Sequence, residues 1–329
     1  MRFGPVPLTE ALGAILAHSV EVGEGRLRKG RVLDAEALVR LEAAGLSEVT
    51  VARLGPEDVH EDEAARSLAE ALVPDPARAG LRLGPAATGR VNVFSEVRGV
   101  AEVARARIDA ANRVDPAITI ATVPEWQRMG RGGMVATVKI IPYAVNREAL
   151  TRACAEAHGA LAMRPTIMET ATLIQTVVGD DDGEKGHRAL RTRLDRLGVG
   201  LGPKTVVRHE MTALAEAIAA AESDVILVLT GSATSDIADT APAALRLAGG
   251  EVEHFGMPVD PGNLLFLGRL GRRPVIGLPG CARSPALNGA DWVLERVVCG
   301  VPVTAADIQG MGVGGLLKEI PERGRPREG

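Results

Sequence analysis

The chain has 329 residues, of which 46% are hydrophobic and only 2% aromatic, and its formal net charge is −4. A chain of this length can bury a large core, and 38 glycines beside mostly aliphatic apolar side chains suit tight packing of strands against helices. The balanced charge and the scarcity of aromatic stacking platforms argue against nucleic-acid binding. Apolar runs fall short of the roughly 18 uncharged residues that span a membrane, so we expect no membrane segment.

The cysteines and the N-terminal residues indicate the compartment. Cys154, Cys281 and Cys299 are an odd number without metal-ligand spacing, which is typical of a reducing compartment rather than of a disulfide framework. Two prolines and a glutamate interrupt the N-terminal residues, where a secretory signal would need an unbroken apolar run. We therefore expect a cytoplasmic protein.

The first half of the chain mixes helix and strand patterns. An amphipathic helix is predicted to begin at Leu8, and residues 134–145 (MVATVKIIPYAV) predict one long strand with Pro142 at an edge or a bend. Further helices are predicted at 34–44, 57–73 and 99–113, and a strand at 49–53. We expect an N-terminal α+β region at residues 1–80 and a less regular α+β segment, with the long strand, at 81–165.

From Pro165 onward, strand and helix patterns alternate. The predicted strands are 172–178, 204–208, 225–229, 252–254, 264–267 and 274–278, and the predicted helices are 185–197, 212–221, 240–247 and 286–298. Units of this length require parallel pairing and right-handed crossovers, which predicts a doubly wound, mostly parallel sheet over residues 166–304. The predicted fold class is therefore α/β with a smaller N-terminal α+β region, and residues 305–329 are expected to form a C-terminal tail.

Two of the predicted strands end abruptly in loops of small residues. The apolar run 225–229 stops before Gly231, and the run 274–278 stops before Gly280. Ligands of doubly wound sheets bind beyond the carboxyl ends of the strands, where unpaired backbone N–H groups and helix dipoles receive anions. Both loops therefore predict a binding site for an anionic small molecule.

The loop after residue 229 offers both hydroxyls and carboxylates. Its candidate ligand-binding residues are Thr230, Gly231, Ser232, Thr234 and Ser235, followed by Asp236 and Asp239. Hydroxyls and backbone N–H groups suit phosphate or pterin oxygens, and a carboxylate beside a phosphate is usually explained by a bridging Mg²⁺. Asp236 and Asp239 are therefore candidate metal ligands and candidate catalytic residues. The alternative is that either aspartate caps the helix predicted from Thr240.

The segment before the strand 264–267 is a proline-rich turn with a carboxylate at its apex. Its candidate ligand-binding residues are Asp260, Pro261, Gly262 and Asn263. The prolines and Asp260 suit a rigid turn, and a position just before a strand of the same sheet also suits contact with a ligand. Both interpretations stay open.

The loop after residue 278 places a cation where a helix is predicted to start. Its candidate ligand-binding residues are Pro279, Gly280, Arg283 and Ser284. A cation at a helix N-terminus opposes the helix dipole unless an anion lies between them. We therefore predict that Arg283 contacts the anion of the ligand. The alternative is an ion pair with a nearby carboxylate.

These motifs resemble those of the molybdopterin-binding domain shared by MogA-type molybdopterin adenylyltransferases and MoeA-type molybdopterin molybdotransferases. The family's GGxSxGxxD loop, PGKP-like turn and GLPGNPxSA segment correspond to residues 231–239 (GSATSDIAD), 261–263 (PGN) and 277–284 (GLPGCARS), in the same order and spacing. Residues 8–73 also resemble the opening of the molybdotransferase, with a KGxxL segment at 29–33. The whole most resembles a stand-alone molybdopterin-binding protein that is also found fused to a molybdenum cofactor cytidylyltransferase.

The resemblance implies a role in molybdenum cofactor biosynthesis. The implied ligand is molybdopterin or the molybdenum cofactor, in free or nucleotide form, with Mg²⁺ beside it, and the implied activity is that of a molybdopterin molybdotransferase. One alternative is a non-catalytic carrier that serves a cytidylyltransferase or a molybdoenzyme apo-protein. Another is a nucleotide pyrophosphatase, as in competence-damage-inducible proteins that use a similar domain. The resemblance is also compatible with a homo-oligomer.

Several positions depart from the pattern of the family. Ser232 and Asp236 replace two of the loop's glycines, and Asp260 and Asn263 replace the lysines around the PG turn. The loss of positive charge disfavours a bare pyrophosphate and favours one that is screened by Mg²⁺. The carboxylate segments that follow the first strand of the molybdotransferase domain are reduced to residues 179–183 (GDDDG). The resemblance therefore supports ligand binding more directly than molybdenum insertion.

Overall fold

The computed structural model describes residues 1–23, 25–179 and 182–317. Asp180 and Asp181 of the GDDDG segment, and the charged end of the chain after residue 317, lie outside the described residues. Within the described ranges, no helix has both the length and the apolar character that a membrane-crossing segment requires.

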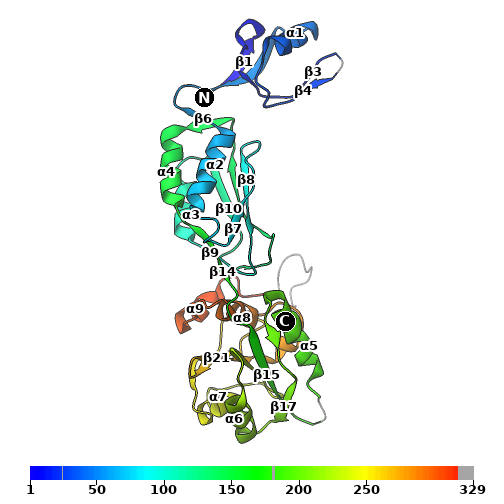
Figure 1. Ribbon diagram of the computed structural model, residues 1–329, viewed down its shortest axis with the longest axis vertical. Coiled ribbons are helices and arrows are strands. Elements are labelled where there is room, and N and C mark those ends of the chain that lie inside the picture. Colours follow the sequence, from blue (N-terminus) through cyan, green and yellow to red (C-terminus); the bar gives the residue numbers. More distant parts are fainter. Residues whose placement is uncertain (24, 180–181, 318–329) are drawn as a thin grey trace, which may run out of the picture. The chain divides into compact units, whose positions relative to one another are not determined.

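Contacts between Cα atoms divide the chain into two compact units, whose elements are labelled in Figure 1. Unit 1 contains residues 1–97 and 101–163, and unit 2 contains residues 98–100 and those from 164 onward. The domain boundaries expected after residues 80, 165 and 304 stay predictions.

The first half of the chain forms short strands and four helices. Its strands are β1 (Arg2–Pro7), β2 (Ile15–Leu16), β3 (Val20–Glu21), β4 (Arg26–Leu27), β5 (Glu48–Arg53), β6 (Asp58–His60), β7 (Leu81–Leu83), β8 (Arg90–Ser95), β9 (Gly99–Val103), β10 (Ile118–Thr122), β11 (Arg128–Met129), β12 (Met134–Ile140), β13 (Ala144–Asn146) and β14 (Leu161–Pro165). Its helices are α1 (Ala35–Ala43), α2 (Glu61–Leu72), α3 (Arg105–Asn112) and α4 (Arg147–Ala157), with a 3-10 turn, η1, at Leu8–Glu10.

The described residues of unit 1 form two hydrophobic cores. The smaller core lies between α1 and the sheet β1-β5-β2, and Leu41 and Val51 are buried in it. The larger core lies between the sheet β10-β12-β8-β7 and the helices α2 and α4, and it buries Leu68, Val93 and Ile118 completely. Aliphatic side chains are sufficient to fill both cores without aromatic residues. The β-branched side chains fill the strand faces, and the alanines let the helices approach the sheet closely.

Several predictions for the first half of the chain are wrong. The helix expected from Leu8 is a single 3-10 turn, because the residues before it pair with β5 as strand β1. The helix expected at 57–73 divides into β6 and α2, and the one expected at 99–113 divides into β9 and α3. The strand expected at 134–145 breaks into β12 and β13 around Pro142, which cannot donate a ladder hydrogen bond. Pairing with strands distant in sequence overrides the local periodicity in these segments.

Unit 2 alternates strands and helices. Its strands are β15 (Thr170–Val177), β16 (Gly200–Leu201), β17 (Thr205–Arg208), β18 (Val225–Leu229), β19 (Glu251–Phe255), β20 (Phe266–Leu270) and β21 (Arg273–Leu278). Its helices are α5 (Glu184–Leu197), α6 (Met211–Ala220), α7 (Thr240–Leu247), α8 (Gly289–Val298) and α9 (Ala305–Gln309), with 3-10 turns η2 (Gly280–Arg283) and η3 (Gly310–Gly312).

The strands of unit 2 form one seven-stranded sheet. Its order is β16-β15-β18-β21-β20-β19, and β17 also pairs with β15. The pairings among β15, β16, β17, β18 and β21 are parallel, whereas β20 and β19 are added antiparallel at one edge. Every residue of β18 is buried, as expected for a central strand covered on both faces. The mixed α/β fold with a mostly parallel sheet is therefore as expected, and the finer doubly wound arrangement stays a prediction.

The start of α8 differs from the sequence prediction in a way that affects the site. The expected helix 286–298 begins only at Gly289, because Asn288 and Asp291 form a capping box there. The carboxylate of Asp291 accepts from the backbone N–H of Asn288 at 2.8 Å, and the side chain of Asn288 accepts from the backbone N–H of Ala290 at 2.9 Å. Arg283 therefore lies in a 3-10 turn before the helix and not at the helix N-terminus.

Candidate functional site

The carboxyl edge of the sheet in unit 2 brings together two of the predicted loops. β18 and β21 are parallel neighbours, so the loops after Leu229 and Leu278 leave the sheet at the same edge. Nη2 of Arg283 donates a hydrogen bond to the carbonyl oxygen of Thr230 at 2.9 Å and so joins the loops directly. β15, on the other side of β18, ends at this edge too and leads into α5.

Much of the hydrogen-bonding capacity of the 230–239 loop is used within the loop. Oγ1 of Thr230 donates to the carbonyl oxygen of Ser232 at 2.6 Å and lies 3.4 Å from Oγ1 of Thr234, and both threonines are buried. In the described chain, no hydrogen bond uses the backbone N–H groups of Ser232 and Ala233. The two threonines therefore stabilise the conformation of the loop. The backbone N–H groups of the exposed residues Ser232 and Ala233 are available as donors to a ligand.

Asp236 and Asp239 both accept hydrogen bonds from backbone N–H groups near the start of α7. Asp239 is the N-cap, and its carboxylate accepts from Thr240 at 2.6 Å and from Ser235 at 2.9 Å. These N–H donors, that of Ser235 first, hold the pKa of Asp239 below its ordinary value. Asp236 accepts from the N–H of Ala238 at 2.7 Å. Over the residues described, no group of three or more His, Cys, Asp or Glu is arranged to hold a metal, and the metal-binding role of the two aspartates stays a prediction.

Sequence reasoning missed a polar contact between Gly231 and the end of β15. The backbone N–H of Gly231 donates to Oγ1 of Thr176 at 3.0 Å, and Nδ1 of His209 lies 2.7 Å from the same oxygen. A Cβ on Gly231 would lie 2.9 Å from the carbonyl oxygen of Thr176, so this glycine allows the loop to approach the strand closely. The one local signal was a buried polar pair, Gln175 and Thr176, at the end of an apolar strand. His209 reaches it only because β17 pairs with β15.

A buried arginine on α5 holds the second loop in place, and sequence reasoning missed it as well. Arg193 is 7% exposed, and its Nε donates to Oδ1 of Asp291 at 2.5 Å. Its Nη groups donate to the carbonyl oxygens of Ala282, Ser284 and Ala286 at 3.0, 2.7 and 2.9 Å. A buried guanidinium is tolerated only when its donors are paired, so these bonds set the backbone path of the loop.

Arg283 also lines a pocket beside the first turns of α5. The pocket has a volume of about 320 Å³ and is lined by Lys185, Arg188, Ala189, Thr192, Arg283 and Pro285. Lys185 forms no ion pair with a described residue, and Arg188 has only a 4.0 Å contact with Glu184, which also pairs with Lys204. Of the described residues, three cations and no carboxylate line this pocket, which favours an anionic ligand with an apolar body.

The turn that contains Asp260 and Asn263 bonds to other parts of unit 2. The N–H of Asp260 donates to the carbonyl oxygen of Gly315 at 2.8 Å, and the carbonyl oxygen of Pro261 accepts from the N–H of Gly289 at 2.8 Å. These bonds attach the turn to the start of α8 and to the C-terminal segment, and none of the described hydrogen bonds ties it to the 230–239 loop.

The predicted site residues differ in accessibility. Those that are exposed are Gly231, Ser232, Ser235, Asp236, Asn263, Gly280 and Ser284. Those that are half-buried are Asp239, Asp260 and Arg283, and those that are buried are Thr230, Thr234, Pro261, Gly262 and Pro279. The buried members are covered by the protein itself, whereas the exposed and half-buried members are accessible from solvent.

Taken together, fold and site define an α/β protein whose mostly parallel sheet carries a polar carboxyl edge and a cationic pocket. Residues 5–53 match a family model described as "Domain of unknown function (DUF8806)". No curated protein matches the chain. Among solved structures, the chain is similar to the molybdopterin biosynthesis MoeA protein from Pyrococcus horikosii, at 15% identity and a TM-score of 0.30, covering 94% of this chain and 76% of that chain. A TM-score of 0.30 carries no structural inference, so the function is inferred from motifs and contacts.

Proposed function

We propose that unit 2 binds molybdopterin or the molybdenum cofactor, a phosphate-bearing pterin, in molybdenum cofactor biosynthesis. The observation that carries the proposal is the hydrogen bond from Arg283 to Thr230, because it joins the two loops whose motifs resemble the molybdopterin-binding domain. Both loops lie at the carboxyl edge of a mostly parallel sheet, where open α/β sheets bind their ligands.

The phosphate of the ligand is proposed to lie in the cationic pocket. Lys185, Arg188 and Arg283 supply the positive charge, and Ala189 and Pro285 supply apolar surface for the body of the ligand. Arginine suits this role because its planar fork of donors matches phosphate oxygens. The exposed loop at Ser232 offers further donors for pterin oxygens.

Binding of Mg²⁺ with the ligand is a further part of the proposal. Mg²⁺ in proteins is commonly held by one or two carboxylates together with substrate phosphates. Asp236 and Asp239 lie on the neighbouring loop, outside the lining of the cationic pocket, and each already accepts a backbone N–H, so they would hold the ion only when oxygens of the ligand complete its coordination. We expect EDTA to weaken ligand binding by at least tenfold. Equal affinity with and without EDTA would leave the aspartates with capping roles alone.

Mass spectrometry of the ligand that co-purifies under anaerobic conditions tests the proposed function. Molybdopterin or its nucleotide form is the expected result. Turnover of adenylylated molybdopterin with molybdate would then identify a molybdotransferase, and tight binding without turnover would identify a carrier. Release of a mononucleotide from a dinucleotide would identify a pyrophosphatase instead. Both aspartate carboxylates already accept hydrogen bonds from backbone N–H groups of the loop, and this structural role favours the non-catalytic carrier.

Substitution of Arg188 tests the pocket. Arg188→Gln should weaken molybdopterin binding by about 1.5–3 kcal/mol, the scale of a charge-assisted hydrogen bond, as measured by fluorescence quenching. Arg188 makes only a long surface ion pair, so the variant should keep its stability. Arg196→Gln is the matched control, because Arg196 is exposed on the same helix outside the pocket. Equal affinities of both variants and the unchanged protein would remove the pocket from the site.

A further inference from the structure

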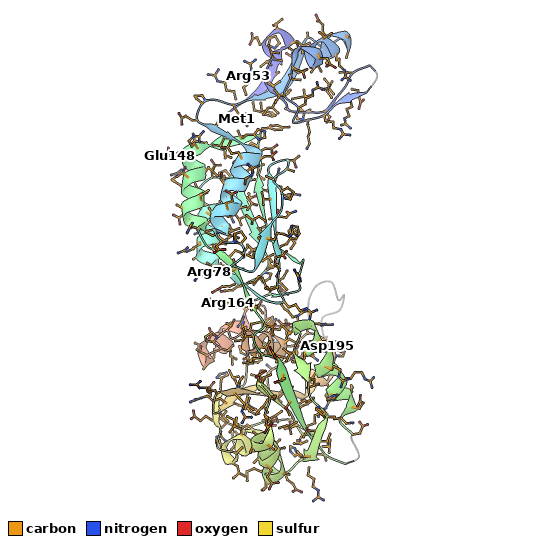
Figure 2. All side chains as sticks on the ribbon, in the orientation of Figure 1. Met1, Arg53, Arg78, Glu148, Arg164 and Asp195 are labelled. Carbon is orange, nitrogen blue, oxygen red and sulfur yellow. The ribbon has the colours of Figure 1, made fainter. Side chains whose placement is uncertain are left out.

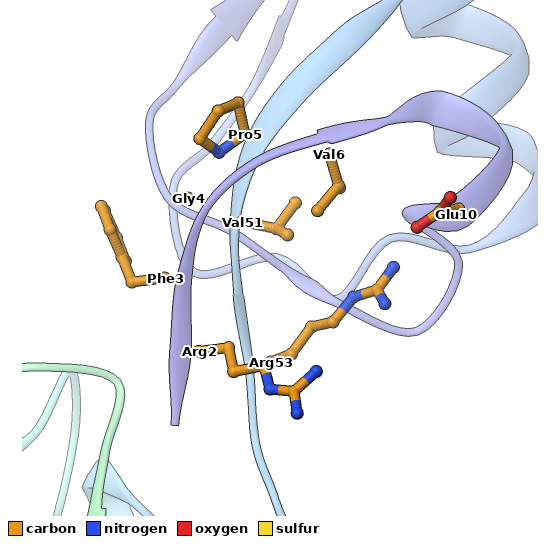
Figure 3. A pocket seen from close by; sticks show the side chains of 8 residues that line it. All are labelled: Arg2, Phe3, Gly4, Pro5, Val6, Glu10, Val51 and Arg53. Atoms are coloured by element: carbon orange, nitrogen blue, oxygen red, sulfur yellow. The ribbon is translucent and has the colours of Figure 1, made fainter.

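A second pocket lies in unit 1, on the sheet β1-β5-β2 and largely within the segment that matches a family of unknown function. Its volume is about 260 Å³. In Figure 3 the side chains of Arg2 and Arg53 start at one end of the pocket, Gly4 and Val51 lie in the middle, and Arg53 extends toward Glu10. None of the candidate site residues of unit 2 lines this pocket.

The register of the β1–β5 ladder places two arginines directly opposite each other. Arg2 pairs with Arg53, and Gly4 pairs with Val51, so all four positions share one face of the sheet. Like charges at directly opposite positions of an antiparallel pair destabilise it. Among the described residues, neither guanidinium has a hydrogen-bond acceptor or an ion-pair partner. The register therefore places two arginines at neighbouring positions, and neither guanidinium is paired with a described carboxylate.

The carboxylate at this end of β1 is already engaged. Asp58 accepts from the N-terminal ammonium of Met1 at 2.6 Å and from the backbone N–H of Gly55 at 2.7 Å. These contacts, that of the ammonium first, lower the pKa of Asp58 below its ordinary value, so it remains ionised and committed to them. Glu10 is the acidic residue that lines the pocket; the Arg53 side chain extends toward it in Figure 3, and no ion pair joins it to a described residue.

The backbone of β1 makes the hollow and keeps it open. Gly4 has no side chain, and an added Cβ would meet nothing within 4 Å, so the space above it is free. Val51, which is 1% exposed, forms an apolar floor opposite Gly4. Pro5 and Pro7 restrict the backbone of this edge strand, so the cavity exists before a ligand arrives.

We propose that this pocket binds a small organic oxyanion, a carboxylate or a phosphate monoester on a short apolar body, with its charge between Arg2 and Arg53. Two arginines at paired positions provide several N–H donors, and the planar fork of each guanidinium matches carboxylate and phosphate oxygens. A bound oxyanion converts the cross-strand repulsion into attraction. The volume is below the roughly 300–1,000 Å³ of pockets for drug-sized molecules, which restricts the body to a few atoms or one ring. The site is independent of the function proposed for unit 2.

Calorimetric titration of the full chain with phenyl phosphate and with benzoate tests the proposal. At least one of the two should bind, and the tighter one identifies the oxyanion. Arg2→Gln and Arg53→Gln should each weaken that binding by about tenfold or more, because each variant loses a charge-assisted hydrogen bond to the anion. Arg78→Gln is the control, since Arg78, labelled in Figure 2, is an exposed arginine of unit 1 outside the pocket.

The outcome separates this site from the one in unit 2. In the Arg188→Gln background, substitution of Arg2 or Arg53 should weaken anion binding by the same factor as in the unchanged protein. The two sites are therefore tested separately, and one proposal can fail while the other holds. If Arg53→Gln does not fold, Arg53→Lys keeps the charge but loses the planar fork and should still bind more weakly. Failure of both anions to bind, unchanged affinity in the variants of Arg2 and Arg53, or an equal loss in Arg78→Gln would overturn the proposal.

Discussion

Gly231 illustrates how much the role of one residue depends on contacts that a motif does not reveal. The sequence marks Gly231 as a candidate ligand-binding residue, and the structure shows that the absence of its side chain lets the loop approach β15. The N–H of Gly231 is taken by the hydroxyl of Thr176, which His209 also contacts. Substitution here therefore acts on the fold as well as on a ligand.

Gly231→Val should lower the free energy of unfolding by about 1–3 kcal/mol, the usual cost of overpacking, because its Cβ would lie 2.9 Å from the carbonyl oxygen of Thr176. Urea denaturation measures the change. Gly310→Ala is the matched control, because a Cβ there meets nothing within 4 Å and its φ is −70°. If Gly231→Val proves as stable as the control, the close approach of the loop to β15 is wrong.

The pH dependence of stability should reveal the capping role of Asp239. Its pKa in the folded state is lowered by the N–H groups of Ser235 and Thr240 from an ordinary value of 3.8. The contribution of the charged carboxylate is therefore complete above that ordinary value and is lost as the pH falls through the lowered, folded-state pKa. Asp239→Asn keeps an acceptor but loses the charge, so its deficit at pH 7 should shrink at pH 3 in urea denaturation. A deficit that is the same at both pH values would contradict this assignment.

At the scale of elements, the second loop of the site depends on a helix that is not adjacent to it in sequence. Arg193 of α5 binds three carbonyl oxygens of the loop, and its ion pair with Asp291 also ties α5 to α8. Both partners of the pair are buried, at 7% exposure each. The hydrogen bonds from Arg193 of α5 therefore fix the path of the loop that carries Arg283.

Arg193→Met should destabilise the protein by about 3–5 kcal/mol, because it leaves the buried carboxylate of Asp291 without its partner. The double variant Arg193→Met with Asp291→Leu should recover part of this stability but not the ligand binding, since the loop carbonyl groups stay unpaired. Thermal denaturation and fluorescence quenching measure the two effects. Recovery of both stability and binding in the double variant would show that the loop keeps its path without Arg193.

At the scale of the whole molecule, the two units have separate hydrophobic cores. We expect calorimetric unfolding of the full chain to depart from a single two-state transition, because each core can melt as its own cooperative unit. Molybdopterin should raise the transition of unit 2, and the oxyanion bound by Arg2 and Arg53 should raise that of unit 1. A single transition, with equal calorimetric and van't Hoff enthalpies, would contradict independent melting.

The sequence by itself determines most of unit 2. The runs and caps that predict β18 and α7 are local, so both elements have the predicted bounds, and the motif loops follow the strands as expected. Local signals were weaker in the first half, where β1, β6 and β9 form only because distant strands pair with them and override helical periodicity. The capping alternative for Asp239 was likewise predictable, since a cap involves neighbouring residues only.

The tertiary structure alone decides which distant side chains meet. Arg193 and Asp291 are 98 residues apart, Arg283 and Thr230 are 53 apart, and Thr176 and His209 are 33 apart, so no local pattern could pair them. The facing arginines of β1 and β5 likewise depend on a register that only strand pairing sets. Local periodicity and capping follow from interactions within a few residues, whereas site geometry follows from packing of whole elements, which is why the sequence located the loops but not their contacts.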